Sequence, residues 1–232
     1  MTPENHILTA LPVEVLDRLA PYLAQVTLEK GEIIQYPGDP VTHLYFPIDC
    51  LCSITITMED GAVAEVGMVG IWDVFGISAF LGSRETAQTD ASVQVPGRAL
   101  KIEAQVVRQA FNQNAVLRDV LLRYTQAFMA QVAQTAACNA LHSLEQRLPR
   151  WLLEAQWQLK SDDLPLTQEF LATMLGVRRA GVTQTAQKLQ ERKLIQYRRG
   201  NVRILNQSGL EATGCECFRT IQAQYKRLLA EQ

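Results

Sequence analysis

The stretch "LTQEFLATMLGVRRAGVTQTAQKLQERKLIQYRRGNVRIL", residues 166–205, contains two helical patterns followed by two short strand patterns. Thr167 can cap the first helix, Glu169 suits its first turn, and Gly176 can end it in a left-handed conformation. The second helix is expected over roughly 179–192, where apolar residues recur at spacings of four and three. Two helices joined by a short turn that contains glycine predict a helix-turn-helix.

The segment that follows, and the charge around it, extend this prediction. Two short strand patterns flank Arg199, Gly200 and Asn201, which is the arrangement of a wing. Residues 178–203 hold eight Lys/Arg and one acid, although the whole chain carries a formal charge of -2. Residues 1–140 have a net charge of -7 and residues 141–232 a net charge of +5. This asymmetry indicates that the C-terminal part meets a polyanion while the N-terminal part does something else.

Duplex DNA is the polyanion that such a motif binds. The second helix enters the major groove, where an arginine that bonds a guanine with two hydrogen bonds contributes about 1–3 kcal/mol of discrimination. A solvated basic surface is the alternative, but the spacing, the wing and the charge together favour DNA. The predicted DNA-contacting residues are Thr167, Gln168, Arg178, Arg179, Ala180, Thr183, Gln184, Lys188, Arg198, Arg199 and Arg203.

The N-terminal half has a different pattern. A helical opening over residues 11–23 is followed, from about residue 30 to 102, by short alternating runs between Gly, Pro and Asp residues. Asp60-Gly61 between two such runs is a strong hairpin signal. These features predict a small antiparallel barrel or roll. Residues 70–84 interrupt the strands and suggest a loop with a short helix.

From about residue 106 the apolar period becomes helical. One stripe close to a heptad seam can pack on its own domain or pair with a second copy, and we predict pairing because no other local partner is obvious. Its residues are Leu117, Leu121, Tyr124, Phe128 and Val132. The next helix contains Pro149, which is expected to end or bend it.

The predicted fold class is α+β with three parts. Residues 1–110 form an antiparallel β-roll, residues 111–140 a central dimerisation helix, and residues 141–232 a winged helix-turn-helix. No targeting signal is visible at the start, and charged residues interrupt the most apolar long window, so we expect a cytoplasmic protein without membrane contact. No nucleophile–base motif, P-loop or dinucleotide fingerprint is present, so we expect no catalytic residues and no enzyme.

Three stretches carry a resemblance to a known family. They are "EKGEIIQYPGD" (29–39), "VGMVGIWDVFGISAFLG" (66–82) and "LPLTQEFLATMLGVRRAGVTQTAQKLQERKLI" (164–195). With these stretches the chain resembles the Crp/Fnr family of bacterial transcription regulators over nearly its whole length. The resemblance implies that residues 1–110 form a cyclic-nucleotide-binding-like β-roll. It also implies a homodimer that binds a two-fold symmetric DNA site, RNA polymerase as a protein partner, and a switching signal received by the N-terminal domain.

The resemblance is weaker in the loop that would receive the signal. Members that respond to cyclic AMP place a Glu and an Arg there; Gly76 matches, but those two positions fall at Ile77 and Thr89. A cyclic phosphate without its arginine loses a charge-assisted bond, so cyclic AMP is not expected. A cyclic dinucleotide, another small molecule, or no ligand remain open, and no cofactor is certain. The candidate effector-binding residues are Gly76, Ile77, Ser78, Arg84, Thr86, Thr89, Arg98, Arg123 and Tyr124.

The five cysteines lead to a second functional hypothesis. Cys50 and Cys52, like Cys215 and Cys217, form a C-x-C pair, and Cys138 stands alone on the central helix. We expect buried packing and no metal site, because zinc ligands are usually spaced C-x2–4-C and the three histidines show no ligand pattern. A thiol or metal redox sensor on the same scaffold, and a regulator that acts mainly through protein contacts, remain alternatives.

Overall fold

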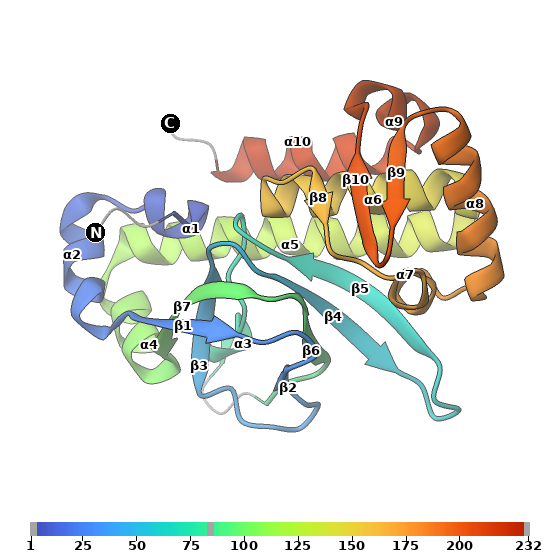
Figure 1. The fold of residues 1–232 in the computed structure, drawn as a ribbon. Helices are drawn as coiled ribbons and strands as arrows, with labels where there is room; N and C mark the ends of the chain where they lie inside the picture. The colour runs from blue at the N-terminus through green and yellow to red at the C-terminus, as the bar shows by residue number, and fades with distance from the viewer. Residues whose placement is uncertain (1–3, 83–85, 230–232) are drawn as a thin grey trace.

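The computed structural model describes residues 4–82 and 86–229 of the 232-residue chain. It begins with three short helices, followed by a roll, a long helix and a helical C-terminal part (Figure 1). The opening helices are α1 (His6–Thr9), α2 (Val13–Leu19) and the 3-10 helix η1 (Ala20–Tyr22). No helix in these two ranges is both long enough and apolar enough to cross a bilayer.

Two antiparallel sheets make the roll, as the alternating runs predict. The first has the order β1-β7-β3 and the second the order β2-β6-β4-β5. The strands are β1 (Ala24–Leu28), β2 (Ile33–Gln35), β3 (His43–Pro47), β4 (Leu51–Thr57), β5 (Val63–Val69), β6 (Asp90–Val95) and β7 (Gly97–Glu103). The predicted interruption between β5 and β6 contains the short helix α3 (Ser78–Leu81).

The hairpin expected at Asp60-Gly61 joins β4 to β5. The amide of Met58 donates to the carbonyl of Ala62 at 2.8 Å, and the amide of Gly61 donates to the carbonyl of Met58 at 2.9 Å. Gly61 has a φ of +83°, the left-handed region that a residue with a side chain rarely adopts. The hairpin prediction is confirmed.

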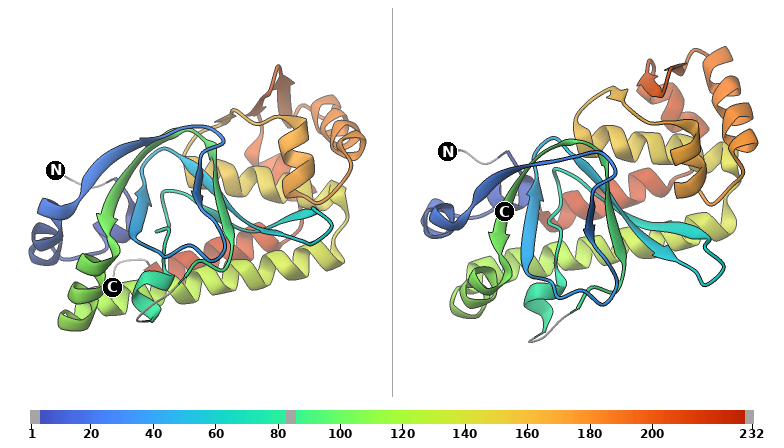
Figure 2. Two further views of the ribbon diagram at one scale, coloured as in Figure 1. Left: turned by 90° about the horizontal axis from the view of Figure 1, so that it is seen from below. Right: turned by 60° about the horizontal axis from the view of Figure 1, so that its bottom comes forward.

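The long helix α5 (Ala115–Leu141) follows α4 (Ala104–Gln113) and spans most of the molecule. Asn114 caps it, because its side chain accepts a hydrogen bond from the amide of Leu117 at 2.9 Å. The last helix, α10 (Cys217–Leu229), returns beside α5, as Figure 2 shows. Apolar residues of α10 thereby join the core that α5 shares with the roll.

This arrangement corrects the prediction for the dimer seam. Leu117, Leu121 and Tyr124 are 2%, 1% and 0% exposed within the single chain, and Phe128 and Val132 are half-buried. The roll and α10 cover the stripe that the heptad pattern assigned to a second copy. The sequence pattern identified a buried stripe correctly, but periodicity does not reveal whether the covering element belongs to the same chain or to another.

The helix α6 (Leu144–Leu159) differs from the expectation in a second respect. Ser143 and Gln146 form a capping box at its start, and the helix continues through Pro149. The helix therefore does not end at Pro149, which was one of the two effects expected of this residue. Proline removes one backbone donor near the first turns, and the burial of Trp151, Leu152 and neighbouring apolar side chains outweighs this loss.

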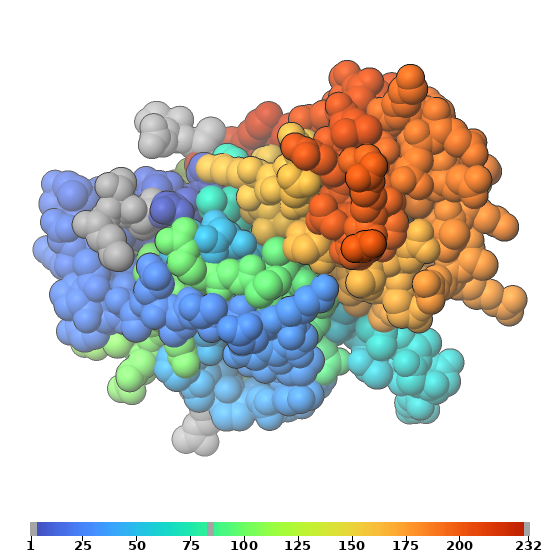
Figure 3. All heavy atoms as spheres, viewed as in Figure 1, coloured from blue at the N-terminus to red at the C-terminus, as the bar shows by residue number. Residues whose placement is uncertain are grey.

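The C-terminal part contains the predicted winged helix-turn-helix. Its elements are β8 (Asp163–Leu164), α7 (Gln168–Met174), α8 (Arg179–Glu191), β9 (Ile195–Arg198), β10 (Asn201–Ile204) and α9 (Gln207–Thr213). The strands form a small sheet of order β8-β10-β9. Figure 3 shows this part and the N-terminal helices at opposite ends of the molecule.

Candidate nucleic-acid interface and effector pocket

The turn between α7 and α8 is held by backbone bonds of the Schellman type. The amide of Val177 donates to the carbonyl of Ala172 at 2.9 Å, and the amide of Gly176 donates to the carbonyl of Thr173 at 3.1 Å. Gly176 has a φ of +62°. At the other end of α7, the hydroxyl of Thr167 accepts from the amide of Phe170 at 3.1 Å. Both local predictions for α7 are confirmed.

The helix α8 has one buried and one open face. Val182, Ala186 and Leu189 are buried, as their spacing predicts. The exposed side chains of the first turns include Arg179 and Thr183, and the Thr183 hydroxyl donates to Oε1 of Gln168 at 2.7 Å. All predicted DNA contacts of α8 are exposed: Arg178, Arg179, Ala180, Thr183, Gln184 and Lys188.

The other basic candidates surround this helix. Arg198 and Arg199 are exposed on the β9–β10 hairpin, whose turn places Arg199 and Gly200 at φ values of 46° and 80°. Arg203 Nε lies 3.7 Å from Oδ1 of Asp163. This pair and the Lys188–Glu145 pair are exposed, so each contributes about 0–1 kcal/mol and competes weakly with a phosphate. The structure gathers the candidates on α7, α8 and the hairpin at one end of the molecule (Figure 1).

A cavity of about 120 Å³ lies between the roll and α5. Five of the predicted effector-binding residues line it: Gly76, Ile77, Ser78, Thr89 and Tyr124. The sequence analysis missed the other lining residues, which are Gln35, Ile54, Val69, Val74, Phe75, Gln88 and Phe128. None of these twelve described lining residues carries a charge. The cavity therefore suits a small molecule that is neutral where it contacts them.

Three predicted effector residues lie elsewhere. Arg98 Nε bonds Oδ2 of Asp49 at 2.7 Å, and Arg123 Nε lies 2.9 Å from Oδ2 of Asp119. Thr86 is exposed and forms a bridge with Pro40. The assignment of these three residues to the pocket is therefore corrected. Each of the two arginines therefore already has an acidic partner. Arg84 lies outside the described residues.

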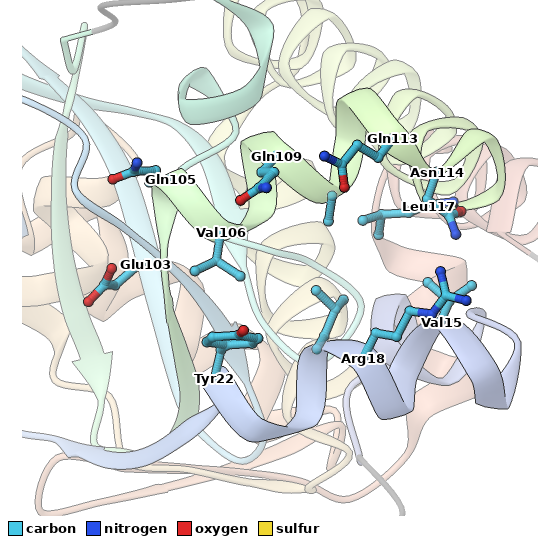
Figure 4. Close-up of a pocket in the computed structure, with 12 residues that line it drawn as sticks. Val15, Arg18, Tyr22, Glu103, Gln105, Val106, Gln109, Gln113, Asn114 and Leu117 are labelled. Atoms are coloured by element: carbon cyan, nitrogen blue, oxygen red, sulfur yellow. Dashed lines mark hydrogen bonds between the residues drawn. The ribbon is translucent and has the colours of Figure 1, made fainter.

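A second cavity, of about 410 Å³, lies between α2 and α4 (Figure 4). Gln105, Gln109 and Gln113 follow one face of α4, opposite Arg18 and Tyr22. This volume is within the range of small-molecule sites, but none of its lining residues belongs to the loop in which the effector was expected. The four-residue spacing of the glutamines was the available sequence signal.

Two buried carboxyl groups connect the roll to the C-terminal part. Trp151 Nε1 donates to Oε1 of Glu65 at 2.6 Å, and burial raises the pKa of Glu65 to about 7. The Tyr225 hydroxyl and Gln158 Nε2 donate to the two carboxylate oxygens of Asp73, each at 2.6 Å. Burial also raises the pKa of Asp73 to about 7. The sequence analysis singled out none of these residues, which come from β5, α6, α10 and the loop after β5.

The cysteines fall into two groups. Cys50 and Cys52 are buried in the core of the roll. Cys138, Cys215 and Cys217 form a separate buried cluster. The expectation of buried packing holds for the cysteines of the roll, whereas His142 completes the second group as a set of four candidate ligands.

Both halves of the chain match known domain families. Residues 25–114 match the cyclic nucleotide-binding domain, and residues 146–213 match the Crp-like helix-turn-helix domain. The chain is 24% identical over 186 residues to the global nitrogen regulator of Nostoc sp., covering 77% of this chain and 83% of that protein. The Synechococcus elongatus global nitrogen regulator is likewise 24% identical, with 77% and 84% covered.

Solved structures show the same fold. FixK2 from Bradyrhizobium japonicum superposes with a TM-score of 0.72 at 15% identity, covering 83% of this chain and 98% of that one. The c-di-GMP responsive global regulator CLP of Xanthomonas campestris gives a TM-score of 0.65 at 18% identity, with 83% and 99% covered. The paired domains, the exposed recognition helix and these relatives lead to one conclusion: the chain belongs to the Crp/Fnr family of DNA-binding transcriptional regulators, which are not enzymes.

Proposed function

We propose that this protein is a homodimer that reads a two-fold symmetric DNA site through α8 and responds to a small molecule in the roll. The observation that carries the DNA-reading part is the exposed N-terminal half of α8, which presents Arg178, Arg179 and Gln184 beside a basic wing. Helix-turn-helix proteins place these positions against base edges, while surrounding Lys and Arg contact phosphates.

Replacing Arg179 by alanine tests this proposal. Arg179 Nη1 lies 3.8 Å from the Glu169 carboxylate, and both side chains are largely exposed, so the arginine is available to a base. We expect Arg179→Ala to cost about 1–3 kcal/mol of affinity for the preferred DNA sequence and to relax the preference at one base position. Fluorescence anisotropy measures the affinity on DNA selected by the wild-type protein from a random pool.

Arg18→Ala is the matched control for this experiment. Arg18 is also an exposed arginine on a helix, but it lies on α2 at the opposite end of the molecule. Its replacement removes the same charge and should leave the affinity for the selected sequence unchanged. Equal losses in the two variants, or no loss at Arg179, would contradict the proposed role of α8.

We place the dimer contact on the open face of α5, one position away from the predicted seam. Exposed residues recur there in heptad order, and the side chains of Leu122 and Met129 are 45% and 65% exposed. Small residues continue the stripe toward the end of the helix at Ala133, Ala136 and Ala140. Apolar positions in heptad register with small side chains allow a second copy of α5 to approach closely.

Met129→Glu tests the dimer. A carboxylate at this position would be buried against the partner helix, so we expect dissociation into folded monomers with an unchanged circular dichroism spectrum at low temperature. Light scattering during size-exclusion chromatography measures the mass. Val13→Glu is the control, because Val13 is 63% exposed on α2 and lies away from the stripe. A Met129→Glu protein that stays dimeric would rule out this face.

The effector proposal rests on the cavity between the roll and α5. Its volume of about 120 Å³ is below the roughly 300–1,000 Å³ of sites for drug-sized ligands, and its described walls are uncharged. Cyclic dinucleotides need cationic partners for two phosphates, and Arg98 and Arg123 are paired with acids elsewhere. We therefore favour an uncharged ligand that is smaller than a cyclic dinucleotide. Tyr124 and Phe128 on α5 connect an occupant of the cavity to the long helix.

Thermal unfolding checks this choice. A ligand present at 100 times its dissociation constant adds about 2.7 kcal/mol to the free energy of unfolding, which shifts the melting temperature visibly. We expect no shift with cyclic AMP or with cyclic dinucleotides. A shift with either nucleotide class, abolished by Tyr124→Phe or Phe128→Ala, would reverse the preference.

We assign one function to each of the three expected parts of the chain, with α10 as an exception. Residues 1–110 would sense, residues 111–140 would pair, and residues 141–232 would bind DNA. The exception is α10, whose Ile221, Tyr225 and Leu228 pack into the core of the roll and α5. The C-terminal helix therefore connects the DNA-binding part directly to the core of the sensing part.

The thiol or metal alternative is favoured by one observation, the convergence of Cys138, Cys215 and Cys217 with His142. Among the described residues, Cys50 and Cys52 do not belong to a comparable group of candidate ligands. Of the two cysteine pairs in the alternative hypothesis, only Cys215 and Cys217 have this support.

A further inference from the structure

Four side chains that can bind a metal meet where α5 ends and α10 begins. Cys138 lies in the last turn of α5, and His142 directly follows that helix. Cys215 precedes α10, and Cys217 is its first residue. One ligand atom from each of the four residues lies within 4.8 Å of the other three.

The spacing of these atoms fits one tetrahedral ion. Zinc–sulfur bonds of about 2.3 Å and zinc–nitrogen bonds of about 2.0–2.1 Å place neighbouring sulfurs about 3.8 Å apart, and sulfur and nitrogen about 3.6 Å apart. The Sγ atoms of Cys138 and Cys215 are 3.6 Å apart, and Cys217 Sγ is 3.5 Å from Nδ1 of His142. The three thiols and the imidazole form a Cys3His set, which is a common composition of structural zinc sites.

The surroundings resemble the outer shell of a metal site. Nε2 of His142, the ring nitrogen that does not face the sulfurs, lies 3.6 Å from the Glu216 carboxylate. Carboxylates in this position orient ligating histidines and raise the basicity of the ring nitrogen that binds the metal. Gln134 Nε2 donates to Cys217 Sγ at 3.1 Å, a contact that favours a thiolate.

The burial and charge of the group point the same way. Cys138 and Cys217 are 0% exposed and Cys215 is 7% exposed. Arg147 and Arg150 interact electrostatically with Cys138, and each keeps a buried Nε without a hydrogen-bond partner in the part of the chain that the structure describes. Three thiolates and a neutral imidazole around a divalent ion carry one net negative charge. The guanidinium of Arg147 would balance that charge, because Arg150 is already paired with the Glu154 carboxylate at 2.6 Å.

Other chemistry fits the group less well. A disulfide needs sulfurs about 2.05 Å apart, and all five cysteines are free in the structure. A multi-iron cluster needs more space than ligand atoms within 4.8 Å of one another leave. Three thiolates with one imidazole suit a soft or borderline ion such as zinc and disfavour magnesium or calcium.

We propose that Cys138, His142, Cys215 and Cys217 bind one zinc-class divalent ion that fastens the end of α5 to the start of α10. The four ligands come from two segments of the chain that are far apart in sequence: Cys138 and Cys215 are separated by 77 positions. The ion would hold the short connection from α5 to α6, and therefore the angle at which the DNA-binding part leaves the long helix. The site itself is independent of the proposed dimer and effector, while any effect on DNA binding rests on the proposed function.

The test uses the full-length protein purified without a histidine tag. Mass spectrometry of the dialysed protein measures the metal content, and cobalt added to the chelated protein reports thiolate ligation through its charge-transfer and d–d absorption bands. We expect about one zinc per chain, tetrahedral cobalt bands, and a lower melting temperature after chelation. His142→Ala and Cys215→Ser should each lose the tetrahedral cobalt spectrum. Cys50→Ser, which removes a buried thiol of the roll, should keep it.

The cysteine variants could lose the metal simply because they fail to fold, so a second variant leaves all four ligands in place. Glu216→Gln removes the charge of an exposed side chain that contacts His142 but binds no ion itself. We expect it to weaken metal affinity about 10–100-fold in competition with a chromogenic chelator, with an unchanged circular dichroism spectrum. A wild-type protein that holds no zinc and gives no tetrahedral cobalt spectrum would overturn the proposal. A metal-free Cys138–Cys215 disulfide in the purified protein would also overturn it. These measurements need no DNA, so a negative result would contradict the metal site without contradicting the DNA-reading role tested with Arg179→Ala.

Discussion

Replacing Trp151 by alanine should lower the free energy of unfolding by about 3–5 kcal/mol, the usual cost of removing a buried tryptophan. Trp151 is 0% exposed on α6, and its ring meets Phe170 of α7 edge-on with centroids 5.7 Å apart. Its Nε1 donates to Glu65 of the roll at 2.6 Å. The side chain therefore connects the DNA-binding part to β5, and its loss opens a cavity at this junction. Urea unfolding followed by circular dichroism measures the effect.

Two further variants separate packing from hydrogen bonding at this site. Trp151→Phe retains most of the ring but leaves the buried Glu65 carboxyl without its indole donor, which should cost about 1–3 kcal/mol. Tyr22→Ala removes an aromatic ring that is 58% exposed on η1, and should change stability by less than about 0.5 kcal/mol. A loss below 1 kcal/mol in Trp151→Ala would show that the junction does not contribute to folding as described.

The free energy of unfolding should depend on pH through Glu65 and Asp73. Burial raises the pKa of Glu65 from 4.5, and that of Asp73 from 3.8, in each case to about 7. Between about pH 4 and 7 the folded protein therefore keeps protons that the unfolded chain releases. The stability that these two groups contribute is present in full below pH 4 and is lost as the pH rises through 7.

The measurement must allow for a histidine that works in the opposite direction. Burial, with a smaller contribution from Lys160, lowers the pKa of His6 from 6.5 to about 4, so its contribution to stability grows as the pH rises through this range. Comparison with Glu65→Gln isolates the carboxyl, because glutamine can still accept the Trp151 hydrogen bond but does not ionise. We expect the wild-type stability to fall relative to this variant by up to about 3 kcal/mol between pH 4.5 and 7.5. Parallel curves for the two proteins would show that Glu65 keeps an ordinary pKa in the folded state.

The C-terminal motif was predictable because its determinants are local. The Thr167 cap, the left-handed Gly176 and the buried spacing of Val182, Ala186 and Leu189 each act within a few residues. The same holds for the hairpin at Gly61. A charge excess on one short segment also needs no tertiary information. The helix-turn-helix, the wing, the roll and the division of charge between the two halves all follow from such short-range signals.

The dimer seam and the effector residues were harder to predict from the sequence, and for the same reason. The stripe from Leu117 to Tyr124 is apolar because something covers it, and only the fold reveals that α10 and the roll do so. Arg98 looks free in the sequence, yet Asp49 pairs with it across the fold. The Asp119–Arg123 pair, four residues apart on one helix, was readable from the sequence but was overlooked. Burial and charge pairing depend on which surfaces meet, and an amphipathic pattern is the same for a partner in the same chain and a partner in another.

The sequence by itself predicted the strands of the roll, the long helix, the winged helix-turn-helix and the DNA-binding character of this protein, but not the helices α9 and α10. The tertiary structure alone decided that Cys138 and His142 meet Cys215 and Cys217, and that Glu65 and Asp73 are buried against α6 and α10. Local propensities act over one or two turns of the chain, whereas a ligand set or a buried carboxyl requires several distant segments to pack in one place. The return of α10 along α5 brings the cysteines and histidine together, and it also places Tyr225 beside Asp73.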